Sequence, residues 1–419
     1  MGMTTDADVI VVGAGLAGLA AAAAARQAGR RVVVLEAHGS GGRAGTVERD
    51  GFTLNMGAHA LYRHGEGMRV LVALGLTPEG EAPPLARYRA LSGGCLHVLP
   101  TGPASLLRTG ALGARSKAQL AHLLGRLPRL RTHGLDRTTV EEWLAASRLR
   151  PDAASVVRAL LRLSTYSDDT ERFSAGAALG QLQLATSGGV LYLHGGWRQL
   201  VDGLSRSLDL RTGVQVDGLD RRGDDVEVRL SGGTLVAHRV VVATGTPASV
   251  RRMLPSDPDW GELGPPVTAA CLDLGLSRVP EPGYVLSLDD PVYATVQSPP
   301  ARQAAGHGAV MAVIRYGARS AAEDRPQLDE LAAAAGVGHD DVVVRRFLAR
   351  MTVSGALPLA SRGGLIGRPG IGDTGVPGVL MAGDWVGPVG LLADASLASG
   401  YAAGRLAGHD RPVSTKMVA

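Results

Sequence analysis

Cysteine is scarce in this chain of 419 residues: only Cys95 and Cys271 are present, far apart and in no CxxC or metal-ligand spacing. The scarcity excludes a disulfide-stapled secreted fold and a cysteine-based metal centre. We therefore expect two ordinary thiols in a reducing cytoplasm and no metal. Hydrophobic residues make up 45% of the chain and charged residues 20%. This balance is typical of a globular protein, and at this length two domains are expected.

A signal peptide and a membrane-spanning run are also missing from the sequence. Acidic Asp6 and Asp8 precede the first apolar run, which argues against a secretory signal. That run, residues 9–25, carries no charge and approaches transmembrane length. Because a glycine motif interrupts it, a phosphate-binding strand–turn–helix unit explains it better. The sequence thus favours a cytoplasmic protein.

The glycine motif, Gly13-x-Gly15-x-x-Gly18, lies between an apolar strand-like run and an alanine-rich helix predicted over about 16–28. In such a unit, Gly13 permits the tight turn and Gly15 lets a pyrophosphate approach the backbone. Gly18 lets helix and strand pack closely. The N-terminus of the helix then offers unpaired N–H groups to the phosphates.

A second predicted strand, residues 32–35, ends in Glu36, eighteen residues after Gly18. A carboxylate at this strand end can accept both hydroxyl groups of a ribose and repels a 2′-phosphate. The whole pattern therefore predicts an ADP-containing cofactor. It does not separate NAD from FAD, because both contain an ADP half.

Segments farther along the chain resemble the GG-doublet flavoproteins. They are Gly41 to Arg43, Phe52 to His59, and the two C-terminal stretches Met381 to Trp385 and Asp394 to Gly400. Residues 210–219 and 239–244 also fit. This superfamily includes flavin amine oxidases, protoporphyrinogen oxidases and phytoene desaturase-type enzymes. The resemblance implies an oxidoreductase with bound FAD on a Rossmann-like α/β fold, completed by an inserted α+β substrate domain.

The resemblance also implies roles for single residues. Glu36 is expected to hold the adenosine ribose, Val216 to contact the adenine through its backbone, and Asp384 to bind the ribityl–pyrophosphate region. The helix starting near Leu392 is expected to point its positive N-terminus at flavin N1, where reduction adds negative charge. The residues assigned to FAD are Gly13, Gly15, Leu16, Ala17, Gly18, Glu36, Ala37, Gly42, Arg43, Gly57, Ala58, His59, Val216, Gly383, Asp384, Leu391, Leu392 and Ala393.

Two positions depart from the pattern of the resemblance. Asn55 stands where many relatives have aspartate, and Ala395 where many have glycine. Neither change removes a phosphate contact, so FAD binding is still expected.

The motifs predict a discontinuous domain organisation. The FAD-binding domain is expected to comprise residues 1–85, 190–255 and 355–419, and the substrate domain residues 86–189 and 256–354. In the FAD domain, residues 225–230 and 233–238 alternate around a Ser-Gly-Gly turn and predict a β-hairpin.

The two inserts differ in pattern. In the first, Ser116-x-x-Gln119 predicts a capping box for a helix ended by Pro128, and Thr138-x-x-Glu141 predicts another. Its leucines at 120, 123, 124 and 127 share one helix face. In the second insert, residues 267–274 and 309–314 predict strands that form the floor of a substrate pocket.

Acidic residues are absent from residues 82–135, the segment we call the basic insert, although the net charge of the chain is only +4. This local positive field suggests contact with anionic lipid headgroups, and hence peripheral attachment at the inner face of the membrane, or guidance of an acidic substrate. The alternative is a solvated helix face whose leucines pack on the domain. No nucleic-acid-binding fold is evident. The basic residues of the insert are Arg87, Arg89, Arg108, Arg115, Lys117, Arg126, Arg129 and Arg131.

Lysines and aromatic residues are scarce too, and this bears on the substrate. Many flavin amine oxidases use a lysine near flavin N5, but the chain has only Lys117 and Lys416, neither in the expected strand. Three Phe, four Trp and eight Tyr leave few residues for an aromatic cage around an amine. Both features argue against amine oxidation, so the sequence favours desaturation of a small, lipophilic or biosynthetic molecule. Three alternatives are left open. They are amine oxidation without the lysine, a non-oxidative, flavin-dependent isomerisation, and a degenerate flavoprotein that only binds a partner.

The sequence names few candidates for acid–base chemistry. His59 and Tyr62 follow the Gly57-Ala58 contact and are the predicted catalytic residues. Arg63, His194 and Trp197 are predicted to line the substrate pocket, Arg63 by holding a substrate carboxylate. The oligomeric state is left open.

Overall fold

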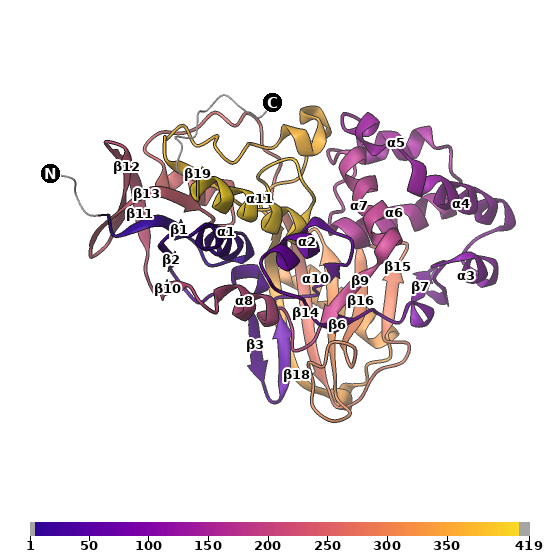
Figure 1. Cartoon of the computed structure of the whole chain (residues 1–419). Helices are drawn as coiled ribbons and strands as arrows, with labels where there is room; N and C mark the ends of the chain where they lie inside the picture. Colours follow the sequence, from indigo (N-terminus) through magenta and orange to yellow (C-terminus); the bar gives the residue numbers. More distant parts are fainter. Residues whose placement is uncertain (1–4, 410–419) are drawn as a thin grey trace.

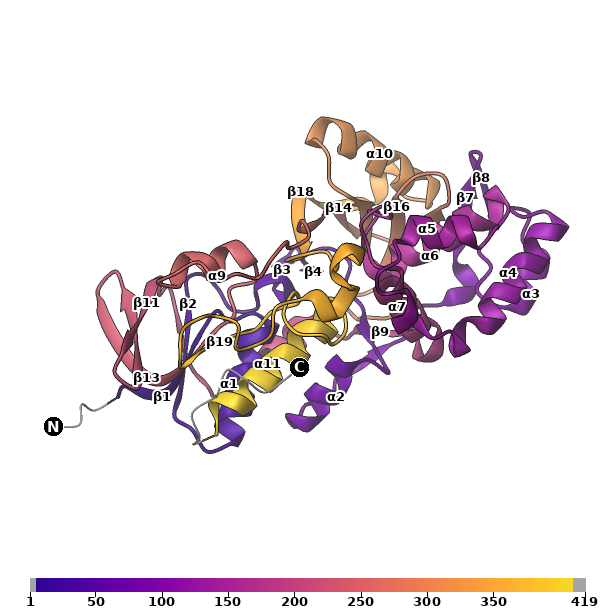
Figure 2. The ribbon, with the colours of Figure 1, turned by 90° about the horizontal axis from the view of Figure 1, so that it is seen from above.

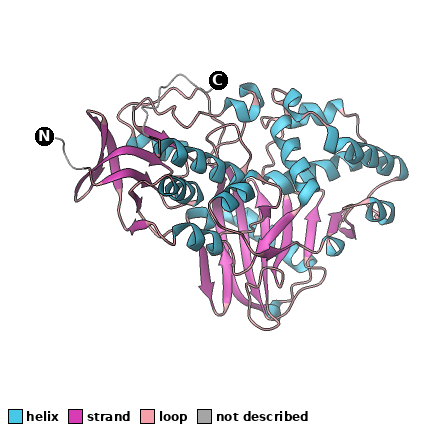
Figure 3. Ribbon diagram, viewed as in Figure 1, coloured by secondary structure: helices cyan, strands magenta, loops and turns pink. Residues whose placement is uncertain are grey.

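A computed structural model describes residues 5–409, which form a mixed α/β fold around two large sheets (Figures 1 and 3). The expected fold class is confirmed. Strands of the first sheet come from the beginning, the middle and the end of the chain, and helices α3 to α7 gather at the far side of the second sheet (Figure 1). The predicted domain boundaries stay a proposal.

The first sheet contains the glycine motif. Its strand order is β10 (Asp209–Thr212), β2 (Val32–Glu36), β1 (Ala7–Val12), β13 (Gly233–Val242), β12 (Asp225–Leu230) and β11 (Val216–Arg222), and β19 (Val379–Met381) pairs with β13. The predicted hairpin is confirmed as β12 and β13, which run antiparallel with Leu230 opposite Gly233. Strand β1 is buried along nearly its whole length, as expected for an apolar strand covered on both faces.

Strand β1 lies between β2 and β13 and runs parallel to both. The chain leaves β1 through helix α1 (Leu16–Gln27) toward β2 on one side, while β13, from much later in the chain, pairs on the other side. In open α/β sheets, ligands bind outside the carboxyl ends of the strands at such a switch in strand order. The fold thus puts the glycine motif at a binding crevice.

Helix α1 packs against α11 (Leu392–Ala407), and the two lie side by side in both views of the ribbon (Figures 1 and 2). Their backbones approach closely because small residues line the contact. A Cβ atom added at Gly400 would lie 2.2 Å from the carbonyl oxygen of Ala17, and one at Gly404 would lie 2.1 Å from that of Ala21. Helix α2 (Glu66–Ala73) packs on α11, and α8 (Arg198–Ser205) on α1. Helix α9 (Pro247–Met253) follows β13.

The second sheet is largely antiparallel. Its strand order is β18 (Val342–Ser354), β14 (Val267–Leu276), β17 (Ala309–Tyr316), β16 (Val292–Ser298), β15 (Tyr284–Ser287), β7 (Arg89–Ser92) and β8 (Cys95–Val98). The predicted strands at 267–274 and 309–314 are confirmed as β14 and β17. Helix α10 (Ala321–Ala334) packs against this sheet. Both cysteines are free thiols, Cys95 exposed and Cys271 buried.

The helices of the first insert are α3 (Pro103–Arg108), α4 (Ala114–Arg126), α5 (Val140–Ala146), α6 (Pro151–Thr165) and α7 (Ala175–Gly188). The predicted helix at 116–127 is confirmed, but its capping box is wrong. Helix α4 begins two residues earlier, and Ser116 instead donates to the Asp152 carboxylate at 2.6 Å. The second capping box is displaced by one residue. Thr139 rather than Thr138 caps α5, and its backbone N–H donates to Glu142 at 2.8 Å.

Short strands connect the two large sheets. β3 (Thr46–Arg49) pairs with β4 (Phe52–Asn55), and β9 (Val190–Leu193) pairs with both β5 (Leu61–Tyr62) and β6 (Gly80–Glu81). Over residues 5–409, no helix combines the length and the apolar character needed to cross a bilayer. The same residues contain no cluster of three histidine, cysteine or acidic side chains arranged to hold a metal.

Candidate active site

A cavity of about 1080 Å³ opens at the carboxyl ends of the first sheet and reaches to β18 of the second. The volume slightly exceeds the usual range of about 300–1,000 Å³ for small-molecule sites. Its walls bring together the β1–α1 turn, the end of β2, the loop after Asn55, the start of α11 and residues 347–353 of β18. The sequence-predicted residues on its walls are Gly13, Gly15, Leu16, Ala17, Glu36, Ala37, Gly42, Arg43, Ala58, His59, Tyr62, Trp197, Val216, Gly383, Asp384, Leu392 and Ala393.

The three glycines of the motif differ in what requires them. Gly13 has φ +106°, and a Cβ there would lie 2.5 Å from the Ala243 carbonyl oxygen. A Cβ at Gly18 would lie 1.9 Å from the carbonyl oxygen of Gly13. Gly15, in contrast, has an ordinary backbone conformation, and no atom of the described chain lies within 4 Å of its added Cβ. The protein itself requires glycine at 13 and 18, whereas the space at Gly15 is left for a ligand.

The N-terminus of α1 is open toward the cavity. Its N-cap is Gly15, so no side chain caps the first N–H groups of the helix. These groups and the helix dipole suit a phosphate. The space at Gly15 and the uncapped helix end fit the pyrophosphate of a dinucleotide.

Glu36 lies at the end of β2, and backbone groups hold its carboxylate in place. Oε2 accepts a hydrogen bond from the N–H of Ala14 at 2.8 Å, and Oε1 accepts one from the N–H of His38 at 2.9 Å. The carboxylate borders the cavity with its remaining lone pairs, as binding of the ribose hydroxyls requires.

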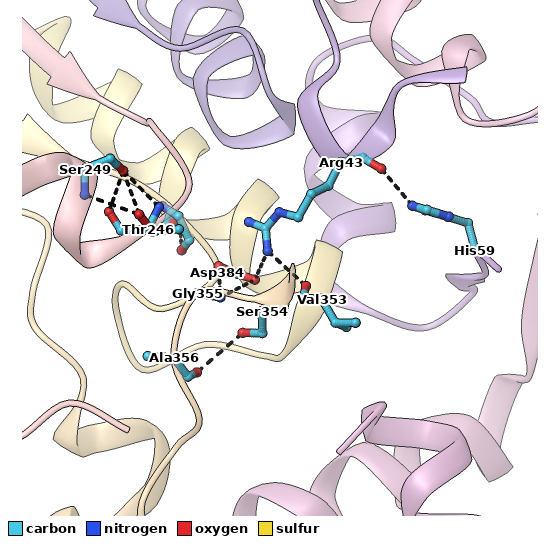
Figure 4. A network of polar contacts seen from close by, with 11 residues as sticks. Arg43, His59, Thr246, Ser249, Val353, Ser354, Gly355, Ala356 and Asp384 are labelled. Carbon is cyan, nitrogen blue, oxygen red and sulfur yellow. Dashed lines mark hydrogen bonds and ion pairs between the residues drawn. The ribbon is translucent and has the colours of Figure 1, made fainter. Parts of the chain in front are cut away.

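An ion pair joins the start and the end of the chain on the cavity wall (Figure 4). Nη1 of Arg43 lies 2.7 Å from Oδ2 of Asp384 and also donates to the carbonyl oxygen of Val353 at 2.9 Å. Asp384 is 1% exposed, and its carboxylate also accepts a hydrogen bond from the N–H of Gly355. Together these bonds tie the loop after β2, the end of β18 and the loop after β19.

A second guanidinium lies near Asp384. Arg368 donates through Nη1 to the carbonyl oxygen of Gly390 at 2.9 Å, while its Nε and Nη2 are buried and have no hydrogen-bond partner among residues 5–409. Burial lowers the pKa of Arg368 to about 10, and Asp384 opposes that shift. One carboxylate thus lies near two guanidinium groups, of which Arg43 lines the cavity and Arg368 does not.

The helix α11 begins at the cavity with no side-chain cap on its N-cap residue, Leu391. Leu392 and Ala393 line the cavity, as predicted, whereas Leu391 is buried in the adjoining core and does not. The first turn also brings Asp394 to the wall, a residue that begins the second predicted flavin motif but was given no role of its own.

The predicted catalytic residues lie on the wall with their polar atoms engaged. In His59, Nδ1 lies 2.9 Å from the carbonyl oxygen of Gly57 and Nε2 lies 2.9 Å from that of Arg43. Burial lowers the pKa of His59; the two carbonyl oxygens oppose this shift, and the charge of Arg43 adds to it. The hydroxyl of Tyr62 donates to the carbonyl oxygen of Ser164 at 2.8 Å. A catalytic role for either stays a prediction.

Of the residues predicted to line the substrate pocket, some line the cavity and others do not. Trp197 lines the cavity and meets the edge of His59, with ring centroids 4.8 Å apart. Its backbone N–H donates to the side-chain oxygen of Asn55 at 2.9 Å. Arg63 is exposed and His194 is partly buried; neither lines the cavity, and the same is true of Gly18 and Gly57. Gly57 has φ +84° and lies against Met351 and Cys271.

Several wall residues escaped the sequence analysis. Tyr166 ends α6 in the left-handed conformation and donates to the carbonyl oxygen of Ala58 at 3.2 Å. Residues 347–353 of β18 form one whole side of the cavity. No motif marks them, and the run of three β-branched valines from Val342 to Val344 was the one available signal of a strand.

Three comparisons place this geometry among known proteins. Residues 16–277, more than half of the chain, match the family model described as flavin containing amine oxidoreductase. Among curated proteins, mitochondrial protoporphyrinogen oxidase of Nicotiana tabacum is 33% identical over 115 residues, which cover 27% of this chain and 23% of that protein. Human all-trans-retinol 13,14-reductase is 46% identical over 61 residues, 14% of this chain and 10% of that protein. The chain therefore matches a quarter or less of the length of these relatives.

Solved structures match over nearly the whole chain. Putrescine oxidase bound to putrescine gives a TM-score of 0.71 at 19% identity, covering 95% of this chain and 98% of that one. Cyclohexylamine oxidase from Brevibacterium oxydans gives 0.67 at 19% identity, covering 96% and 98%. At these identities the likeness concerns the fold.

Proposed function

Since the chain belongs to the flavin containing amine oxidoreductase family and its cofactor is FAD, we propose that it dehydrogenates a lipophilic small molecule, forming a carbon–carbon double bond. The chemistry that FAD supplies when bound is acceptance of a hydride from a C–H bond. The chain contributes the binding, the alignment of the substrate and the exclusion of water.

One observation carries this proposal: the cavity wall away from the glycine motif is mostly apolar, with Arg350 and Thr352 as polar members of β18, and it contains no lysine among residues 5–409. Its side chains include Met56, Ala58, Phe347, Leu348 and Met351. Lys117 lies on α4 and donates to the carbonyl oxygen of Leu107, and Lys416 is outside the described residues. An apolar wall suits a hydrocarbon substrate, because burial of apolar surface is its main source of binding free energy.

Polar groups near that wall are mostly satisfied within the protein. The hydroxyls of Tyr62 and Tyr166 each donate to a backbone carbonyl oxygen, so neither needs a substrate acceptor. The residues toward the glycine motif would hold FAD: Glu36 the ribose, the N-terminus of α1 the phosphates, and Asp384 with Arg43 the ribityl–pyrophosphate region. The uncapped N-terminus of α11 would stabilise negative charge on the flavin.

A substrate panel tests the proposal. We expect anaerobic reduction of bound FAD, seen as loss of its absorbance near ~450 nm, by a polyene precursor or a porphyrinogen and not by an aliphatic amine or an amino acid. The rate would then be compared in His59→Ala and Tyr62→Phe, because acid–base catalysis contributes about 10²- to 10⁴-fold. Reduction by the amine alone would contradict the proposal. Product formation without FAD reduction or oxygen consumption would instead indicate an isomerase.

Amine oxidation without a lysine is the second candidate, and one observation favours it. Asp394 brings a carboxylate to the cavity wall, where it would attract an ammonium group. Putrescine oxidase and cyclohexylamine oxidase share the fold. If this reading holds, the amine reduces FAD in the panel above.

We also propose that the basic insert attaches the protein to anionic membranes. Arg108, Arg115, Arg126, Arg129 and Arg131 are exposed, and within residues 5–409 none of them pairs with a carboxylate. The leucine face of α4 is not available for this contact, because Leu120 and Leu127 are buried and Leu123 and Leu124 pack on the core. The apolar part of the contact would instead be Leu107 on α3, which is 76% exposed.

We expect the protein to sediment with vesicles that contain anionic lipid and to be released by high salt. A juxtamembrane basic residue contributes about fivefold to the partition coefficient. The pair Arg108→Gln and Arg115→Gln should therefore weaken binding roughly 25-fold. The matched control replaces Arg49 and Arg206, two exposed arginines outside the insert, by glutamine. Equal loss in both double variants would mean that binding follows net charge and not this surface.

A further inference from the structure

The carboxyl group of Asp394 lies between two helix N-termini. It belongs to the first turn of α11, and its Oδ1 accepts a hydrogen bond from the N–H of Gly67, in the first turn of α2, at 2.8 Å. Gly65, the N-cap of α2, packs directly on it: a Cβ added there would lie 2.4 Å from both carboxyl oxygens. Asp394 is 2% exposed and borders the cavity. The contact with Gly65 and the hydrogen bond from Gly67 hold the carboxyl group in one position.

Only one of the two carboxyl oxygens of Asp394 has a hydrogen-bond partner among residues 5–409. Its Oδ2 is buried and has no hydrogen-bond partner among residues 5–409. Leaving a buried charged oxygen without a donor is costly, so this carboxylate binds a proton more readily than an exposed one does. A carboxylate that merely caps two helices would be ionised and fully hydrogen-bonded. Asp394 lines the cavity, and an unsatisfied carboxyl oxygen in a residue at this place points to a role toward what the cavity binds.

The surroundings of Asp394 place its titration in the physiological range. Burial raises the pKa of Asp394 to about 6; the N–H of Gly67 and the charge of Arg69 lower it, and the charge of Glu66 raises it. Glu66 and Arg69 both lie on α2 and pair with each other at 3.2 Å. Tyr62, from β5, is the other titratable group beside the carboxyl, and it stays neutral because burial raises its pKa far above the usual value.

We propose that Asp394 is the proton-holding residue of the FAD site: its carboxylate binds one proton when FAD is reduced and releases it when FAD is reoxidised. The inference rests on the proposed function. When a substrate loses two hydrogens, two electrons and one proton go to FAD, and the second proton goes to Asp394. The bonds broken are the two substrate bonds to hydrogen, and the new O–H bond forms on the buried carboxylate.

The physical reason is charge compensation. Reduction that delivers two electrons and one proton makes the bound FAD one unit more negative. A like charge near a buried carboxylate disfavours its ionised form and raises its pKa by roughly one to two pH units. Between its pKa without this added charge, about 6, and the higher value, we therefore expect Asp394 to take up a proton on reduction. Below and above that window its protonation does not change.

The test is the midpoint potential of the FAD-loaded protein against pH, measured by photochemical reduction without substrate. In a two-electron couple each bound proton contributes about 30 mV per pH unit, the value of a tenfold change. Between roughly pH 6 and pH 7.5 we expect two protons, hence about 60 mV per pH unit, in the wild type and about 30 mV in Asp394→Asn. Asparagine keeps the acceptor for Gly67 and the size of the side chain, but it does not titrate. Equal slopes in the two proteins would overturn the proposal.

A second variant keeps the test decisive if Asp394→Asn fails to fold or to bind FAD. Glu66→Gln removes one negative charge beside Asp394 and leaves the carboxyl group in place. The steep part of the plot should then move to lower pH with the same slope, and an unmoved plot would overturn the proposal. Because a sacrificial electron donor such as EDTA reduces the illuminated flavin, the outcome does not depend on which substrate the protein uses. Failure of the substrate panel and failure of the proton-holding role are therefore distinguishable.

Discussion

Replacing Gly15 by valine will weaken FAD binding severely and leave the protein folded. No atom of the described chain lies within 4 Å of a Cβ at this position, and its φ of −76° suits any residue. The added side chain would fill the space where a pyrophosphate approaches the N-terminus of α1. Loss of two charge-assisted hydrogen bonds, about 1.5–3 kcal/mol each, lowers the affinity by at least roughly a hundredfold. Titration of apoprotein with FAD, followed by flavin fluorescence, measures the change.

The neighbouring glycines provide the control for this variant. Gly13→Ala and Gly18→Ala force a Cβ to within 2.5 and 1.9 Å of backbone carbonyl oxygens. Both should therefore unfold at lower urea concentration even without FAD, whereas Gly15→Val should unfold at the wild-type midpoint. A clear destabilisation of the apoprotein by Gly15→Val would contradict a ligand-only role for that position.

Replacing Asp384 by alanine will lower the free energy of unfolding by about 3 kcal/mol, because it leaves buried partners unpaired. Arg43 loses its ion pair at 2.7 Å, and the N–H of Gly355 loses its acceptor. The estimate lies at the low end for a buried pair, since the side chain of Arg43 is 36% exposed toward the cavity. Urea denaturation of the apoprotein measures the change.

A double-mutant cycle separates the ion pair from the other contacts of Asp384. Arg43→Met removes the charge and keeps the apolar stem, so Asp384→Ala in that background should cost clearly less than in the wild type. Additive effects would mean that Gly355, and not Arg43, accounts for the loss. With FAD present the cost should grow further, because both residues line the cavity that we propose as its site.

Local motifs explain why the cofactor half of the site could be predicted from the sequence. Gly13, Gly15, Gly18 and Glu36 act within one strand–helix–strand unit, so their spacing along the chain already contains their geometry. Helix ends are less well determined, since Thr138 and Thr139 are both good caps and only the reach of Glu142 selects the second.

The substrate half could not be predicted, because it depends on contacts between distant segments. The wall formed by β18 exists only once this strand pairs with β14 and faces the first sheet. Asp394 looks like an ordinary acidic residue in the first turn of a helix until α2 packs on it and leaves one oxygen unsatisfied. Likewise, the leucines of α4 indicated an amphipathic helix but not that the domain core covers them.

The packing of α1 on α11 has a consequence for how the protein is made. The ribosome completes α1 early, but Leu392, where α11 begins, follows Leu16 by 376 residues. At about 5–20 residues per second, translation needs on the order of 20–75 s to cover that distance. During this interval the alanine face of α1 has no partner, and β13 still lacks β19. The nascent chain must therefore be shielded from aggregation, and FAD can be held fully only by a nearly finished polypeptide.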